Sequence, residues 1–127
     1  MRSKISIVLM VVLIVSFCIA GTLAKNEDKP AFARLTITQS NMESFDEMVK
    51  LYRESVVPAA KSQKGYLGIL LLTDRTTGKA ISIAIWESEE DAIANEESGY
   101  YQEQVAKFKD YFTAPPVREG YEVSIKD

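Results

Sequence analysis

A hairpin followed directly by the start of a helix is predicted from residues 65–91, GYLGILLLTDRTTGKAISIAIWESEED. The run 66–73 is apolar at nearly every position, which is typical of a strand covered on both faces. Residues 74–78 have turn chemistry, because an aspartate accepts hydrogen bonds from its own backbone and a glycine tolerates positive φ. Residues 79–87 are therefore expected to return antiparallel to the first run, at the centre of a sheet.

The segment before the hairpin predicts a strand and a helix. Residues 31–38 alternate between two faces, which predicts the first strand. Ser40 and Glu43 have capping-box spacing, which predicts a helix start at this point. Apolar residues then recur every three or four positions from Phe45 to Val56. We expect Pro58 to kink or close this helix.

The segment after the hairpin predicts a helix, a second helical segment and a last strand. Ser88 is a candidate N-cap, and the acidic residues 89–91 suit the first turn of a helix better than a cation site. Gly99 separates this helix from a second helical segment, and residues 117–125 alternate as a closing strand. In the second hairpin strand, the larger side chains Ile81, Ile83 and Ile85 are expected to face the helices.

The resulting order is strand, helix, strand, strand, helix, strand. This order predicts an α+β fold, the ferredoxin-like βαββαβ antiparallel sheet with helices on one face. Because the run 66–73 is apolar on both sides, the second face of the sheet should also be covered. The simplest partner is a second copy of the chain, so we expect a homodimer through the sheet face.

The N-terminus predicts a separate segment. Arg2 and Lys4 precede an uncharged, apolar run over residues 5–24. Residues 1–24 are therefore expected to be a signal peptide, cut after Ala24 or Ala20, or an N-terminal membrane anchor of about 20 residues. Either alternative places the domain outside the cytoplasm, secreted or periplasmic in the first case and membrane-anchored in the second. Residues 25–31 would form a linker and residues 32–127 the domain.

The composition excludes several kinds of chemistry. The chain has no histidine, and its one cysteine, Cys18, lies in the apolar run behind Phe17, a poor context for lipid attachment. The domain therefore lacks Ser/His and Cys/His triads, imidazole bases and thiolate or imidazole metal sites, which leaves carboxylates, tyrosine, lysine, arginine and tryptophan. Loss of Arg2 and Lys4 would change the net charge from −3 to −5, which argues against a nucleic-acid surface.

The pattern PAAKSQKGYLGILLLTDRTTGKAISIAIWESEEDAIA, with SGYYQEQVAKFKDYF and GYEVSI after it, resembles the antibiotic biosynthesis monooxygenase (ABM) family of dimeric α+β barrels. The resemblance covers about residues 32–126, and its most specific parts are Gly65, the Trp86–Glu89 junction and the spacing of Tyr100 and Phe108. It implies a pocket between sheet and helices in each subunit. In catalytic members it also implies oxygen insertion into aromatic substrates without metal, flavin or haem, so no cofactor is expected.

The resemblance also supplies candidate site residues. Trp86 and Tyr100 are the candidate catalytic residues, although Trp86 also suits a core position. Candidate substrate-binding residues are Arg34, Ser82, Tyr101 and Arg118, and the arginines alternatively pair with surface glutamates. Known members carry an asparagine where this chain has Ser82, and the haem-degrading branch uses a histidine that this chain lacks.

Two functions follow as expectations. One is an exported, cofactor-independent monooxygenase acting on an aromatic small molecule. The other is a non-catalytic dimeric domain that binds a hydrophobic small molecule or interacts with another protein outside the cytoplasm.

Overall fold

The computed structural model describes residues 29–127. The predicted leader 1–24 and residues 25–28 of the predicted linker lie outside this range. The elements are β1 (Phe32–Gln39), α1 (Phe45–Leu51), the π-helix η1 (Tyr52–Val56), α2 (Val57–Lys61), β2 (Tyr66–Asp74), β3 (Lys79–Trp86), α3 (Glu89–Glu97), α4 (Tyr100–Ala106) and β4 (Val117–Glu122). None of the helices within residues 29–127 is long and apolar enough to cross a membrane.

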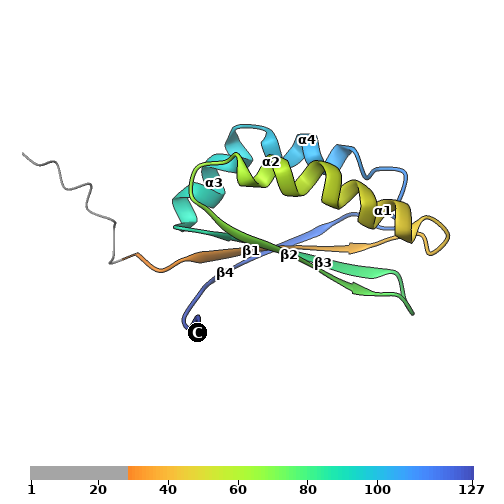
Figure 1. Cartoon of the computed structure of the whole chain (residues 1–127), viewed down its shortest axis with the longest axis horizontal. Coiled ribbons are helices and arrows are strands. Elements are labelled where there is room, and N and C mark those ends of the chain that lie inside the picture. Colours follow the sequence, from red (N-terminus) through yellow and green to blue (C-terminus); the bar gives the residue numbers. More distant parts are fainter. Residues whose placement is uncertain (1–28) are drawn as a thin grey trace, which may run out of the picture.

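The four strands form one antiparallel sheet in the order β2-β3-β1-β4. All the helices lie over the same face of this sheet, as Figure 1 shows. The predicted ferredoxin-like α+β fold is confirmed. The hairpin turn is also as expected, because Asp74 Oδ1 accepts from the backbone N–H of Thr76 at 2.8 Å and Gly78 has φ +79°.

The first helix starts later than predicted. The predicted cap at Ser40 is wrong: the helix begins at Phe45, and Ser40 instead pairs with Phe112 in an isolated bridge. The reason is local, since Asn41 Oδ1 accepts from the backbone N–H of Glu43 at 2.9 Å and so closes a turn before the helix.

Pro58 does not close this helix, which continues to Lys61. A proline lacks the N–H that would bond four residues back, and its ring crowds that carbonyl. The wider π-helical turn Tyr52–Val56 ends two residues before Pro58, and its longer hydrogen-bond spacing accommodates the bond that the proline cannot make. The second predicted cap is correct, because Ser88 Oγ accepts from the backbone N–H of Asp91 at 3.2 Å.

The expectation that the isoleucines of β3 face the helices is wrong. Residues paired across antiparallel strands share a face, and Ile83 stands in one row with Leu35 and Leu70 on the face without helices. The helix side carries Ala80, Ser82, Ala84 and Trp86. Small residues prevail there because the helices approach closely: Ala80 is buried against Phe45 and Met48 of α1.

The face without helices is apolar and open. Leu70, Leu72, Val117 and Tyr121 are each about half exposed on it, at 53%, 49%, 54% and 53%. Clustered apolar exposure of this kind marks an interaction surface more often than a solvent-facing one.

Candidate functional site

A cavity of about 90 Å³ lies between the sheet and the helices. Alternate residues of β1, β2 and β3 form its floor, and side chains from α1, η1, α3 and α4 form its roof. The wall is mostly apolar, with Met48, Ile69, Leu71, Trp86 and Phe108 among its residues. A dry cavity of about 150 Å³ holds benzene, so this cavity suits a small ligand or one that displaces side chains as it enters.

Two hydroxyl groups meet inside the pocket. Tyr52 Oη, from the π-helical turn, lies 2.7 Å from Ser82 Oγ at the centre of β3. Burial raises the pKa of Tyr52 to about 12, although the hydrogen bond to Ser82 partly opposes this shift. At neutral pH Tyr52 is therefore an uncharged phenol, which can donate a hydrogen bond but cannot act as a base.

Tyr100 and Tyr101 begin α4 directly after Gly99, whose φ of +84° sets the direction of this helix. Burial raises the pKa of Tyr100 to about 12, so this second pocket phenol is also uncharged at neutral pH. Tyr101 Oη accepts a hydrogen bond from Thr36 Oγ1 at 3.3 Å and thereby joins the helix layer to β1.

Trp86, the last residue of β3, lines the pocket. It is 3% exposed and packs in a core cluster with Phe32 and Ala92. Its ring meets that of Tyr66 edge to face, with centroids 6.3 Å apart. Trp86 thus serves both as a core residue and as part of the pocket wall.

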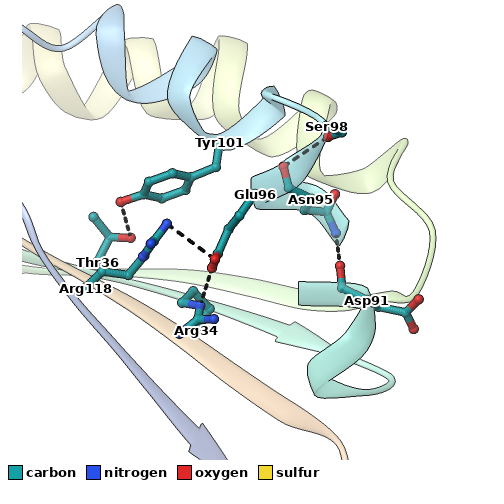
Figure 2. A network of polar contacts seen from close by, with 8 residues as sticks. All are labelled: Arg34, Thr36, Asp91, Asn95, Glu96, Ser98, Tyr101 and Arg118. Carbon is teal, nitrogen blue, oxygen red and sulfur yellow. Dashed lines mark hydrogen bonds and ion pairs between the residues drawn. The ribbon is translucent and has the colours of Figure 1, made fainter. Parts of the chain in front are cut away.

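A charged corner adjoins the same pocket (Figure 2). Glu96 of α3 forms ion pairs with two arginines. Its Oε1 lies 2.7 Å from Nε of Arg34 on β1, and its Oε2 lies 3.6 Å from Nη1 of Arg118 on β4. Arg118 also lies over the ring of Tyr101, 4.9 Å from its centroid. Arg34 and Glu96 line the pocket itself.

The structure brings the predicted site residues together. Arg34, Ser82, Trp86, Tyr100 and Tyr101 all line the one pocket. Arg118 stands outside the lining and touches it through Glu96 and Tyr101. The catalytic and substrate-binding roles predicted for these residues from the sequence stay predictions.

Sequence reasoning missed Tyr52, Asn95, Glu96 and Gln104, which also line the pocket. Asn95 Nδ2 donates to the backbone oxygen of Asp91 at 2.7 Å, and Gln104 Oε1 accepts from Ser55 Oγ at 2.8 Å. The sequence does hold a signal for two of these residues. Asn95 follows Ala92 by three residues, and Gln104 precedes Phe108 by four. Helical spacing thus places each polar residue on the same side as an apolar residue that is buried.

Within residues 29–127 no group of three Asp, Glu, His or Cys side chains is placed to hold a metal ion. The polar groups of the pocket lining are phenols, the hydroxyls of Ser82, Thr36 and Thr38, amides and the Arg34–Glu96 pair.

The chain has the ferredoxin-like α+β fold that the antibiotic biosynthesis monooxygenases share. A candidate antibiotic biosynthesis monooxygenase from Bordetella bronchiseptica superposes with a TM-score of 0.67 at 12% identity, over 76% of this chain and all of that one. A monooxygenase of Streptomyces coelicolor, solved with nanaomycin D, gives 0.62 at 16% identity, over 82% of this chain and 96% of that one. At these identities the likeness confirms the fold of the predicted family.

Sequence comparison gives a second set of relatives. Two uncharacterized proteins from two strains of Mycobacterium tuberculosis are each 31% identical over 97 residues, which is 73% of this chain. The chain spans about two-fifths, 41%, of the length of these curated relatives. No family model matches the sequence.

Proposed function

We propose that this domain binds an aromatic small molecule in the pocket and oxidises it with O₂ without metal, flavin or haem. The observation that carries the proposal is the hydroxyl pair Tyr52–Ser82 at the centre of an apolar pocket walled by Trp86. Such a pocket binds a flat apolar ring and offers its oxygen substituent a donor. The fold is shared with proteins described as monooxygenases.

The reaction balances when the substrate supplies the electrons. A methylene group flanked by aromatic rings becomes a carbonyl and gives up four electrons; one atom of O₂ forms the new C=O bond. The other atom leaves as water with the two hydrogens of the methylene. Because Tyr52 and Tyr100 are uncharged at neutral pH, the substrate's own acidity supplies the anion that reacts with O₂.

In this scheme the pocket residues orient the substrate and exclude water. Tyr52 and Ser82 hydrogen-bond the substrate oxygen on which negative charge develops, while Trp86 holds the ring. The test is O₂ uptake with a hydroxylated anthrone. Uptake should exceed that of protein-free solution and should fall in Trp86→Phe, Tyr100→Phe and Tyr52→Phe.

Tyr111→Phe is the matched control, because Tyr111 packs beside Phe108 but does not line the pocket. Uptake equal to the protein-free rate, with the protein folded, would contradict the oxygenase proposal.

A second function, binding without turnover, is favoured by one specific observation. Tyr52 and Ser82 already satisfy each other, and the one carboxylate of the pocket lining, Glu96, is engaged by arginines. The pocket lining therefore holds no free base. Here an aromatic ligand should raise the melting temperature without consuming O₂.

We further propose that two copies associate through their open sheet faces. The half-exposed side chains of Leu70, Leu72, Val117 and Tyr121 support this arrangement, because burying them against an identical face removes apolar surface from water on both copies. Light scattering at micromolar concentration should give twice the mass of one chain, and a monomer would contradict the dimer.

We also propose that the domain works outside the cytoplasm, secreted, periplasmic or held at the membrane. The supporting feature is the apolar run 5–24 behind Arg2 and Lys4. Mass spectrometry of the protein from its native cells would distinguish a chain cut after Ala20 or Ala24 from one that keeps the run as an anchor.

A further inference from the structure

The charged corner of the pocket has one more positive group than negative. Arg34 and Arg118 approach the two oxygens of a single carboxylate, Glu96, at 2.7 and 3.6 Å. Among residues 29–127 no second carboxylate lies within ion-pair distance of either guanidinium. Arg34 and Glu96 are shielded, with side chains 18% and 17% exposed, whereas Arg118 is 38% exposed and reachable from solvent.

The contact between Arg34 and Glu96 is short but badly directed. Arg34 Nε and Glu96 Oε1 are both buried, and neither makes a hydrogen bond, although they lie 2.7 Å apart. A guanidinium normally meets a carboxylate through two parallel N–H donors. Glu96 therefore neutralises Arg34 without using the donors that an incoming anion would take.

The two guanidiniums are held by aromatic rings. Arg34 lies over Phe32 at 5.1 Å, and Arg118 lies over Tyr101 at 4.9 Å, each measured from the guanidinium carbon to the ring centroid. Gly120 stands opposite Arg34 in the sheet, and a Cβ atom there would come within 2.6 Å of Arg34 Nη1 and 2.5 Å of Phe32 Cζ. The absence of a side chain at residue 120 thus leaves the space in which Arg34 and Phe32 stack.

We propose that the pocket selects a ligand that carries a carboxylate beside its apolar ring, and that Arg34 and Arg118 bind this carboxylate in partial exchange for Glu96. The substrate class named here rests on the proposed function, since it assumes that the pocket receives a small molecule. The ring lies against Trp86 and Tyr100, and the carboxylate reaches the corner formed by β1, β4 and α3 (Figure 2). Glu96 keeps the arginines paired while the pocket is empty.

The test compares two probes of the same shape, benzoate and benzamide, by calorimetric titration of the full chain. Benzoate should bind at least about tenfold more tightly than benzamide, because a charge-assisted bond replaces a neutral one. Equal affinity for the two probes would overturn the anion preference and leave the small-molecule pocket intact. Binding of neither probe would overturn both this inference and the proposed function.

Variants separate the contributions of the charges. Arg118→Gln should weaken benzoate about tenfold and leave benzamide unchanged, and Glu96→Gln should strengthen benzoate by removing its competitor. Arg34→Gln alone would leave the shielded carboxylate of Glu96 without its nearest positive partner. Arg34→Gln is therefore combined with Glu96→Gln, so that both charges of this ion pair are removed together. The double variant should bind benzoate less tightly than Glu96→Gln alone, because Arg118 is then the one guanidinium of this pair that remains.

Arg75→Gln is the control, since Arg75 pairs with Asp46 on the exposed surface away from the pocket lining. Gly120→Ala supplies an independent check, because it displaces Arg34 without changing any charge. It should weaken benzoate more than benzamide. A loss of benzoate binding in Arg75→Gln equal to that in Arg118→Gln would show a general charge effect and overturn the assignment.

Discussion

Tyr52 Oη and Ser82 Oγ lie 2.7 Å apart, although 30 residues separate them in the chain and they come from opposite layers of the domain. Tyr52 belongs to the π-helical turn η1, and Ser82 lies on β3, one of the two interior strands of the sheet. Tyr52 Oη is also 3.4 Å from the backbone oxygen of Leu70, to which it can donate. The hydrogen bond between Tyr52 and Ser82 therefore joins the helix layer to the sheet inside the pocket.

Tyr52→Phe should destabilise the domain by about 1 kcal/mol, because the partly buried hydroxyl of Ser82 then loses its partner. Ser82→Ala should cost a similar amount, and the double variant should cost less than the two single variants together. Denaturant unfolding of all four proteins gives the coupling. Additive losses would mean that the hydroxyl pair contributes nothing beyond its separate members.

Stability should fall at high pH because of the pocket phenols. The pKa values of Tyr52 and Tyr100 are each raised from 10.0 to about 12 in the folded protein. The unfolded chain therefore releases these protons first, and stability that is complete below about pH 10 is lost as the pH rises toward 12. Thermal melts from pH 8 to 12 test this, and the decline should be shallower in Tyr52→Phe/Tyr100→Phe.

Two adjacent leucines of β2 should respond differently to the same charge. Leu71 packs against the core cluster on the helix side, so Leu71→Asp should cost about 2–5 kcal/mol and unfold much of the protein. Leu70 is 53% exposed on the open face, so Leu70→Asp should keep the fold and break the proposed dimer.

Melting curves and light scattering distinguish these outcomes. Thr73→Asp is the control, since Thr73 is an exposed residue of the same strand. A dimer that survives Leu70→Asp would place the interface elsewhere.

Trp86→Ala should destabilise the domain by about 3–5 kcal/mol, because it removes the largest side chain of a core cluster and leaves a cavity beside Phe32 and Ala92. Trp86→Phe should cost less, since an aromatic ring remains to meet Tyr66. Urea unfolding measures both. If Trp86→Phe keeps stability but loses ligand binding, Trp86 acts in the pocket beyond its packing role.

The sequence alone predicted the elements that depend on local chemistry. The hairpin turn at Asp74–Gly78, the Ser88 cap and the break at Gly99 each require a side chain or a backbone angle that a particular residue type provides. The order of these elements then predicted the ferredoxin-like sheet. Where a local competitor was present, the prediction failed: Asn41 closed a turn before the helix that Ser40 was expected to cap.

Only the tertiary structure decided which face of β3 the helices cover and which polar groups meet in the pocket. Alternation assigns residues to two faces without saying which face is packed, and close helix packing selected the alanines over the isoleucines. The pairs Tyr52–Ser82 and Arg34–Glu96 join residues from separate elements. Such contacts depend on how the helix layer stacks on the sheet, and the periodicity within one element does not encode this. The residue types of the pocket were therefore predictable, whereas the geometry of its polar contacts was not.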